Sequence, residues 1–480
     1  MKILKNYSTL SVALVLSRAI LFAREGFLAA TLGPSIYGVW VQVTMVLNYA
    51  LHLPLGYQNI LSREVPFFVG RKDHKLASLI VGATSLVTLA TAVIAGVTIF
   101  LSAFVTDGYW FPISTALLLA IVVVIQQYNG FQSVLLRAEE KFTDFSIGFI
   151  FVSALGFFGA LLSSNSFGVT GPIASQGLAM LLVSMFWFKR CNKYQVISIT
   201  EKFRNITKLW PMAFPLFIGA GLNFIIMSVD RLIVVSFYSK QDAGYYGFAF
   251  ILTQSIHLVA SPIISTLNPK MMRDYGSVKV TSTLLPYFKF FSNLFPVIVF
   301  FTLGIIGITA PSIINQWLPQ YEPSLDILNI LSLSVAPLFI ASGAQMILIA
   351  MARERLVMWG NIGSGLVQML FYGTCVFLNF NLINLAWVVF VFSIFYAIFF
   401  LLICSNLIYE SKRCAYTNVI KLSTYIIFYS FFFIELIKFN IEFEYILILV
   451  LIKLILWSLV MLPILWSGVY SLKLLANDSI

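Results

Sequence analysis

Five ionisable residues interrupt two otherwise apolar stretches of the chain: Arg18, Arg24 and Glu25 in the first, Asp230 and Arg231 in the second. A charge in a membrane helix costs ~2.5–3.5 kcal/mol on insertion scales and usually faces a cavity or a partner. Guanidinium groups bind phosphate oxygens bidentately, so we predict that Arg18, Arg24 and Arg231 bind an anionic cargo. Carboxylates in a low dielectric favour proton uptake. Glu25 and Asp230 are therefore predicted to take up a coupling ion or to pair across the molecule.

A second set of polar residues could form a hydrophilic path for the cargo. Four of them keep helical spacing on one apolar segment, and the others are isolated amides in later segments. Polar side chains also hold membrane helices together, and this structural alternative stays open for each. The predicted cavity-lining residues are Gln42, Tyr49, His52, Asn59, Gln126, Asn223, Gln254, Gln345 and Gln368.

The elements that must position these residues are membrane helices. The chain has 480 residues, 60% hydrophobic and 10% charged, with a mean hydropathy of +0.94. A soluble domain carries about 25% charged residues. The composition therefore predicts an all-α integral membrane protein with no soluble domain. Three histidines in no paired motif and four cysteines without metal-ligand spacing argue against an enzyme and against a bound metal.

Apolar segments of about the ~20 residues needed to span a bilayer recur along the whole chain. We predict about fourteen transmembrane helices, at 7–31, 36–60, 76–104, 110–136, 143–163, 167–188, 211–237, 244–267, 286–309, 323–350, 356–378, 382–407, 418–438 and 443–468.

The positive charges alternate between the connections of these segments. Even-numbered connections and the two termini hold 23 Lys and Arg residues, whereas odd-numbered connections hold only Lys240 and Lys438. The positive-inside rule then places both termini in the cytoplasm. The net charge of +11 follows from this topology, so we expect no nucleic-acid partner.

The two halves of the chain repeat each other. Leu32-Gly33-Pro34-Ser35-Ile36-Tyr37-Gly38 follows Arg24, and Gly244-Tyr245-Tyr246-Gly247 follows Arg231 at nearly the same distance. A second pair of similar segments lies at 135–141 and 349–355. Six helices per copy make a parallel repeat, a transporter design in which rocking lobes alternate access to a central site. We predict an N-lobe at 1–205, a C-lobe at 206–410 and an appended helix pair at 411–480.

The repeat places the charged residues of its first helices at equivalent positions. Arg18 and Glu25 share a helix face, whereas Arg24 points ~100° away. Because sequence neighbours on a helix do not face each other, we predict that Arg24 and Glu25 do not satisfy one another, nor Asp230 and Arg231. Instead, Asp230 is predicted to pair with Arg18 or Arg24 across the lobes, and Glu25 with Arg231, in one access state. The alternative is that these charges only hold the lobes together.

The Leu-Gly-Pro-x-x-Tyr-Gly junction, the Asp230-Arg231 pair and Gly244-Tyr245-Tyr246-Gly247 resemble the polysaccharide-biosynthesis flippases of the multidrug/oligosaccharidyl-lipid/polysaccharide exporter superfamily. The resemblance covers roughly residues 7–410. It implies translocation of an undecaprenyl-pyrophosphate-linked oligosaccharide, such as an O-antigen repeat unit for lipopolysaccharide, from the cytoplasmic to the periplasmic leaflet of the bacterial inner membrane. It further implies no cofactor beyond a proton or sodium gradient, and as partners the lipid-linked substrate, membrane lipid and the polysaccharide polymerase machinery.

Two relatives within the superfamily remain as alternatives. The appended helix pair is more like the lipid II flippase, which differs in cargo. A multidrug or cation antiporter would need a carboxylate-rich cleft without arginines, and Arg18, Arg24 and Arg231 favour an anionic cargo instead.

Overall fold

The computed structural model of the chain describes residues 2–70, 72–105, 112–191, 198–278, 280–409, 420, 453 and 455–458. Every regular element within these residues is helical. Eight of the described helices are long and apolar enough to cross a membrane, and many apolar side chains point outward, such as Leu162 at 83% exposed and Phe377 at 85%. The predicted all-α membrane fold is confirmed. The expected spans 418–438 and 443–468 lie almost wholly outside the described residues.

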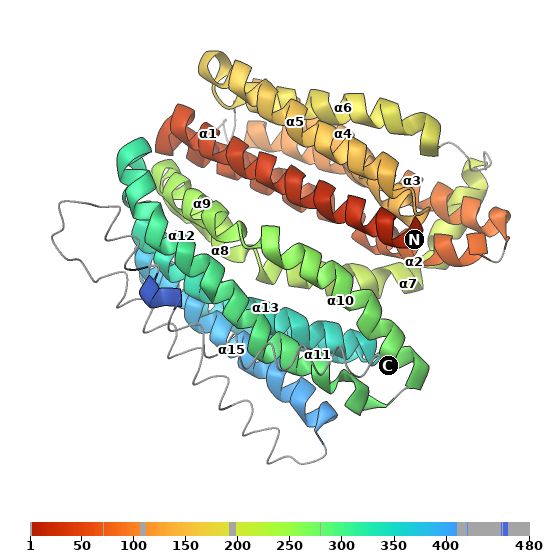
Figure 1. Cartoon of the computed structure of the whole chain (residues 1–480). Helices are drawn as coiled ribbons and strands as arrows, with labels where there is room; N and C mark the ends of the chain where they lie inside the picture. Colours follow the sequence, from red (N-terminus) through yellow and green to blue (C-terminus); the bar gives the residue numbers. More distant parts are fainter. Residues whose placement is uncertain are drawn as a thin grey trace. The chain divides into compact units, whose positions relative to one another are not determined.

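Residues Met1–Met227 form one compact unit. In it α1 packs against α5, α5 against α6, α3 against α4, and α7 against α2 and α3 (Figure 1). Its helices are α1 (Lys2–His52), α2 (Leu55–Gly70), α3 (His74–Val105), α4 (Ile113–Ala138), α5 (Phe142–Phe167), α6 (Thr170–Cys191) and α7 (Ile199–Ile226).

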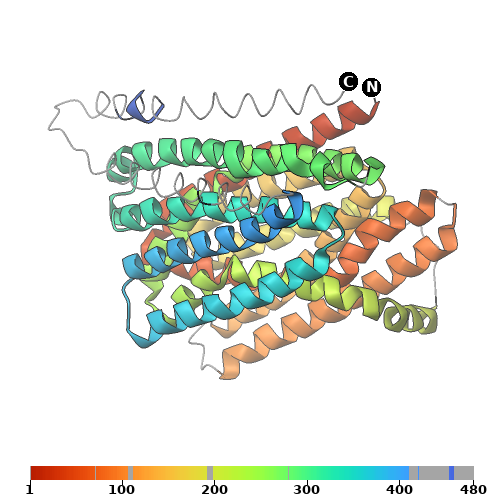
Figure 2. The same cartoon turned by 90° about the horizontal axis from the view of Figure 1, so that it is seen from below.

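Residues Ser228–Ile480 form the second unit. Its central helix is α13, whose apolar window is 72% buried and which packs against α9, α12 and α15 (Figure 2). The helices are α8 (Val229–Phe237), α9 (Lys240–Gln254), α10 (His257–Val278), α11 (Leu285–Lys289), α12 (Phe295–Trp317), α13 (Ser324–Ala350), α14 (Glu354–Phe377) and α15 (Leu382–Ile408), with short turns of other helix types at Thr281–Leu284, Phe290–Leu294 and Pro319–Tyr321. The predicted boundary between lobes at 205/206 stays a prediction.

The predicted span 211–237 differs from the structure at both ends of α7. The helix begins at Ile199, twelve residues early, because the Ser198 side chain caps it by accepting a hydrogen bond from the Glu201 backbone N–H at 3.3 Å. Serine followed three residues later by glutamate is a helix-start pattern. The helix ends at Ile226, and α8 starts after Ser228. The span 244–267 is likewise divided into α9 and α10.

A kink at Gly33 divides α1 where the sequence predicts a junction between the first two spans. Gly33 has φ 69° and ψ 167° and is followed by Pro34. This backbone conformation is essentially restricted to glycine. The Leu-Gly-Pro motif therefore encodes the turn of the chain after its first transmembrane segment.

Replacing Gly33 with alanine should lower the free energy of unfolding by about 1–3 kcal/mol, because a Cβ makes this conformation strained. Thermal unfolding of the purified protein in detergent measures the effect. Gly26→Ala is the matched control: Gly26 lies in the same helix with open space around its missing Cβ, and alanine there should stabilise the helix by about 0.5–1 kcal/mol. Equal effects of the two substitutions would contradict the role of the kink.

Candidate functional site

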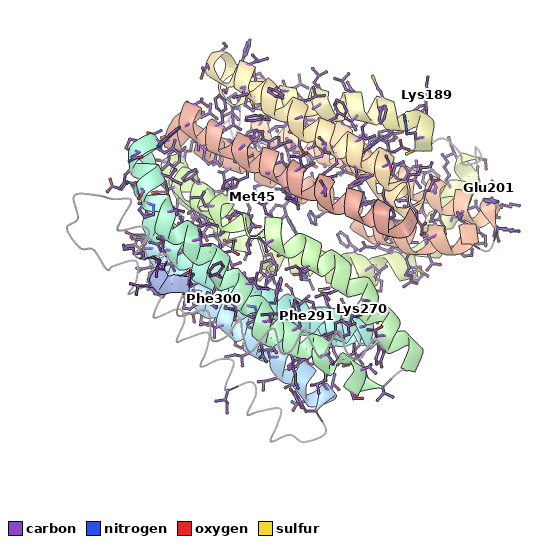
Figure 3. The ribbon with its side chains drawn as sticks, viewed as in Figure 1. Met45, Lys189, Glu201, Lys270, Phe291 and Phe300 are labelled. Carbon is purple, nitrogen blue, oxygen red and sulfur yellow. The ribbon has the colours of Figure 1, made fainter. Side chains whose placement is uncertain are left out.

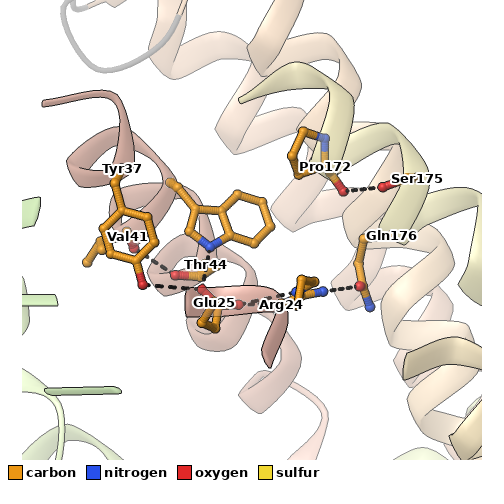
Figure 4. A network of polar contacts seen from close by, with 9 residues as sticks. Arg24, Glu25, Tyr37, Val41, Thr44, Pro172, Ser175 and Gln176 are labelled. Atoms are coloured by element: carbon orange, nitrogen blue, oxygen red, sulfur yellow. Dashed lines mark hydrogen bonds and ion pairs between the residues drawn. The ribbon is translucent and has the colours of Figure 1, made fainter. Parts of the chain in front are cut away.

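Arg24 lies at the centre of a polar network in the first unit (Figure 4). Its Nη2 donates to Glu25 Oε1 at 2.7 Å and its Nε lies 3.3 Å from the same oxygen, while its Nη1 donates to Gln176 Oε1 on α6. The guanidinium group also lies 5.4 Å from the centre of the Trp40 ring. Arg24 is 8% exposed. All three of its nitrogen atoms thus have partners inside the unit.

Glu25 accepts hydrogen bonds from three side chains, those of Arg24, Tyr37 and Trp40. Its Oε2 accepts from Trp40 Nε1 at 2.8 Å and from the Tyr37 hydroxyl at 3.4 Å (Figure 4), and its Oε1 accepts from Arg24. Gly156 on α5 leaves the room for this network, since a Cβ there would lie 2.6 Å from Gln176 Oε1.

The prediction that Arg24 and Glu25 cannot satisfy one another is wrong. Their Cα–Cβ bonds diverge by about 100° around the helix, but both side chains are long and flexible, so their ends meet beside the helix. The side chains are only 10% and 12% exposed, and each buried charge has the other as its partner. The spacing rule for helix neighbours describes exposed faces. Here Gln176 on α6 binds Arg24, and Tyr37 and Trp40 in the second half of α1 bind Glu25, so the ends of both side chains are directed to one place.

Asp230 and Arg231 form a related cluster in the second unit. Asp230 Oδ2 accepts from the Tyr246 hydroxyl at 2.8 Å, and Arg231 Nε lies 3.7 Å from Asp230 Oδ1. The Arg231 guanidinium lies 3.7 Å from the centre of the Phe250 ring. Asp230 is 6% exposed and Tyr246 1%. As predicted for sequence neighbours, Asp230 and Arg231 satisfy one another only weakly, because their 3.7 Å contact is an ion pair beyond hydrogen-bond distance. Pairing between the two lobes stays a prediction.

The two clusters give a chemical reason for the repeated sequence motifs. In each unit the tyrosine of the Tyr-Gly pair donates its hydroxyl to a carboxylate of the preceding helix. In each unit an aromatic ring three or four residues after that tyrosine lies against the arginine. The sequence marked Tyr37 and Tyr246 as repeat positions without giving them a role. Trp40, Phe250 and Gln176 carry no signal in the sequence and were not predicted.

Arg18 differs from the other two arginines. It lies on the exposed face of α1, next to the fully buried Ser17. It forms neither an ion pair nor a hydrogen bond with the residues that the structure describes. Arg18 lies near the middle of the predicted first span, and its side chain is exposed there.

Two of the polar residues in the second half of α1, Tyr49 and His52, contact α7. The His52 ring stacks on Phe224 with 3.6 Å between ring centroids, and Tyr49 meets the same ring edge-on at 4.9 Å. His52 Nδ1 also lies 2.7 Å from the Asn48 carbonyl oxygen. Gln42 is 6% exposed, and its Oε1 accepts no hydrogen bond in the described part of the chain, nor does Gln126 Oε1. The side chains of Asn59, Asn223 and Gln254 are half-buried.

Gln345 and Gln368 are enclosed by the helices of the second unit. Gln345 Nε2 donates to the Tyr396 hydroxyl at 2.6 Å, and that hydroxyl donates to Asn361 Oδ1 at 2.9 Å. Gln345 is 4% exposed and Gln368 3%. This chain of hydrogen bonds joins α13, α14 and α15, so the structural alternative explains Gln345. Within the described residues, His, Cys, Asp and Glu side chains form no group of three able to hold a metal ion.

Comparison with known proteins finds solved structures of the same fold. No protein-family model matches the chain, and no curated protein matches it. The lipid II flippase MurJ in an inward closed conformation matches with a TM-score of 0.72 and 16% identity over 97% of this chain and 99% of that one. An inward-facing multidrug resistance MATE family transporter of the MOP superfamily matches with a TM-score of 0.65 and 16% identity over 81% and 95% of the two chains.

A third solved structure is a MOP superfamily transporter from Pyrococcus furiosus, described as having a binding pocket of reverse polarity. It matches with a TM-score of 0.57 and 16% identity over 88% of this chain and 96% of that one. The chain therefore has the multi-pass membrane fold of these solved transporters.

Proposed function

We propose that this protein is a flippase that moves an undecaprenyl-pyrophosphate-linked oligosaccharide from the cytoplasmic to the periplasmic leaflet of the bacterial inner membrane. Alternating access of two lobes, coupled to a proton or sodium gradient, drives the movement. The observation that carries the proposal is the exposed Arg18 on α1, which has no counter-charge among the described residues. A pyrophosphate cannot cross hydrocarbon unaided, and a guanidinium group is the side chain best suited to bind it.

The three arginines have different neighbours, and we assign them different roles in transport. Arg18 makes the first contact with the pyrophosphate. Arg24 is engaged with Glu25 and Gln176, and Arg231 lies beside Asp230 and Phe250, so each reaches the cargo only if its own cluster rearranges. Such a rearrangement would release Glu25 or Asp230 to take up the coupling ion.

The same charges disfavour export of small cations. A cation exporter needs carboxylates that are open to its substrate, but Glu25 and Asp230 each have an arginine and a tyrosine against them.

Reconstitution in liposomes tests the proposal directly. A fluorescent undecaprenyl-pyrophosphate-linked oligosaccharide is incorporated in both leaflets, and a membrane-impermeant quencher reports how much of it reaches the outer leaflet. We expect flipping that depends on the protein and on an imposed proton or sodium gradient. Flipping that is no faster than in empty liposomes would refute the proposal.

Lipid II is a second candidate cargo, favoured by the match over 97% of this chain and 99% of MurJ. Both cargoes carry a prenyl pyrophosphate, so the arginines do not distinguish them. Deletion of the gene distinguishes the two cargoes. Loss of surface polysaccharide with normal growth would assign the polysaccharide cargo, whereas lysis would assign lipid II. Co-purification with the polysaccharide polymerase would further support the first cargo.

A further inference from the structure

The N-terminal half of α7 carries a stripe of positive charge on its exposed side. Arg204 and Lys208 are both exposed and lie one helical turn apart, which places their side chains on one face. The next position of the stripe is Met212, and Nη2 of Arg63 on α2 lies 3.7 Å from its Sδ atom. Arg63 is 63% exposed on its side chain, and its Nε binds Glu64 at 2.8 Å. Glu201 lies one turn before Arg204 on the same helix, so three cations stand against two carboxylates and the stripe keeps a net positive charge.

An apolar stripe runs beside the charged one on the same helix. Phe203, Trp210 and Phe214 are 59%, 54% and 46% exposed, and their spacing of seven and four residues keeps them on one face. The rings of Trp210 and Phe214 lie 5.4 Å apart. The opposite side of α7 is packed: Ile206 and Leu209 lie against the core of α2 and α3, and the Tyr57 hydroxyl donates to the Ile206 carbonyl oxygen at 2.9 Å. This contact fixes which face of the helix is outward.

The length of α7 determines the depth of the two stripes in a bilayer. The helix has 28 residues and is therefore ~42 Å long at 1.5 Å per residue, compared with a hydrocarbon core of ~30 Å. Its first eight or so residues thus extend beyond the hydrocarbon. Glu201 marks its first turn (Figure 3), and Arg204 lies within this extension. Lys208 lies two residues past it, from where its long side chain reaches the lipid headgroups. Tryptophan is the residue that prefers this boundary.

We propose that Arg63, Arg204 and Lys208 bind the phosphate of an anionic glycerophospholipid, with one acyl chain lying along Phe203, Trp210 and Phe214. Charge complementarity selects this occupant: the apolar stripe accepts any lipid tail, but the adjacent cations prefer an anionic headgroup. The site lies wholly within the first unit. It does not depend on which cargo the protein moves.

Native mass spectrometry of the delipidated protein tests this site with two phospholipids of equal chain length, phosphatidylglycerol and phosphatidylcholine. We expect the wild type to prefer phosphatidylglycerol. Each cation near an anionic lipid contributes about 1 kcal/mol, which is about fivefold in affinity. Arg204→Gln/Lys208→Gln should therefore lower the affinity for phosphatidylglycerol about 25-fold and leave that for phosphatidylcholine unchanged. Adding Arg63→Gln should lower it further.

A control variant removes the same number of charges elsewhere. Lys189 at the end of α6 (Figure 3) and Arg355 at the start of α14 are both exposed, and Lys189→Gln/Arg355→Gln should keep the preference for phosphatidylglycerol. An equal loss in the control variant would overturn the proposal, because net charge and not this site would then explain binding. Preferential binding of undecaprenyl pyrophosphate over phosphatidylglycerol at the stripe would also overturn it and assign the stripe to the cargo. Circular dichroism melting confirms that each variant is folded.

Discussion

Arg18→Ala is expected to reduce the flipping rate at least about 30-fold while leaving the protein folded. Truncating one partner of a desolvated, hydrogen-bonded charge pair costs about 2–5 kcal/mol, and 1.4 kcal/mol is a factor of ten. The loss should fall on transport and not on stability, because Arg18 is exposed and holds no described neighbour in place. The liposome quenching assay measures the rate, and thermal unfolding in detergent measures the stability.

The conservative and control variants separate charge from geometry at this position. Arg18→Lys keeps the charge but loses the planar fork that binds two phosphate oxygens, so its rate should fall between those of Arg18→Ala and the wild type. Arg355→Ala removes an equally exposed arginine at the start of α14 and should not alter the rate. An Arg18→Ala variant that flips its cargo at the wild-type rate would remove Arg18 from the mechanism.

Arg24→Ala is expected to have the largest effect on stability, about 3–5 kcal/mol, because breaking a buried ion pair leaves an uncompensated charge. Glu25 would keep Tyr37 and Trp40 as donors but lose its cation, and Gln176 would lose its donor. The free energy of unfolding and the yield of folded protein from membranes both report this loss.

A double variant distinguishes a structural role of Arg24 from a role in binding the cargo. Arg24→Met/Glu25→Gln removes both charges and keeps the volume, and replacement of a whole buried pair is often neutral. The double variant should therefore regain most of the stability. If Arg24 serves only to hold Glu25, this variant should also flip cargo. Restored stability without flipping would instead assign Arg24 to the cargo or Glu25 to coupling.

Much of the fold could be predicted from the sequence because a bilayer allows few backbone structures for a segment that spans it. A spanning segment must satisfy its backbone hydrogen bonds internally, so apolar length alone located α3, α4, α5, α6, α13 and α15 to within a few residues. The Leu-Gly-Pro motif likewise located the kink at Gly33, where only glycine adopts the backbone conformation. The breaks that divide the expected spans 211–237 and 244–267 have no such local signal.

The sequence by itself determined that this is a multi-span membrane protein, built as a repeat, with ionisable residues at corresponding positions of the two copies. Only the tertiary structure decided what each of those residues contacts. Arg24 meets Glu25 and Gln176 because α5 packs against α1 and α6 packs against α5, and Arg18, six residues earlier on the same helix, stays exposed. The physical reason is that backbone hydrogen bonding is local along a helix, whereas a flexible charged side chain takes its partners from whichever helices surround it.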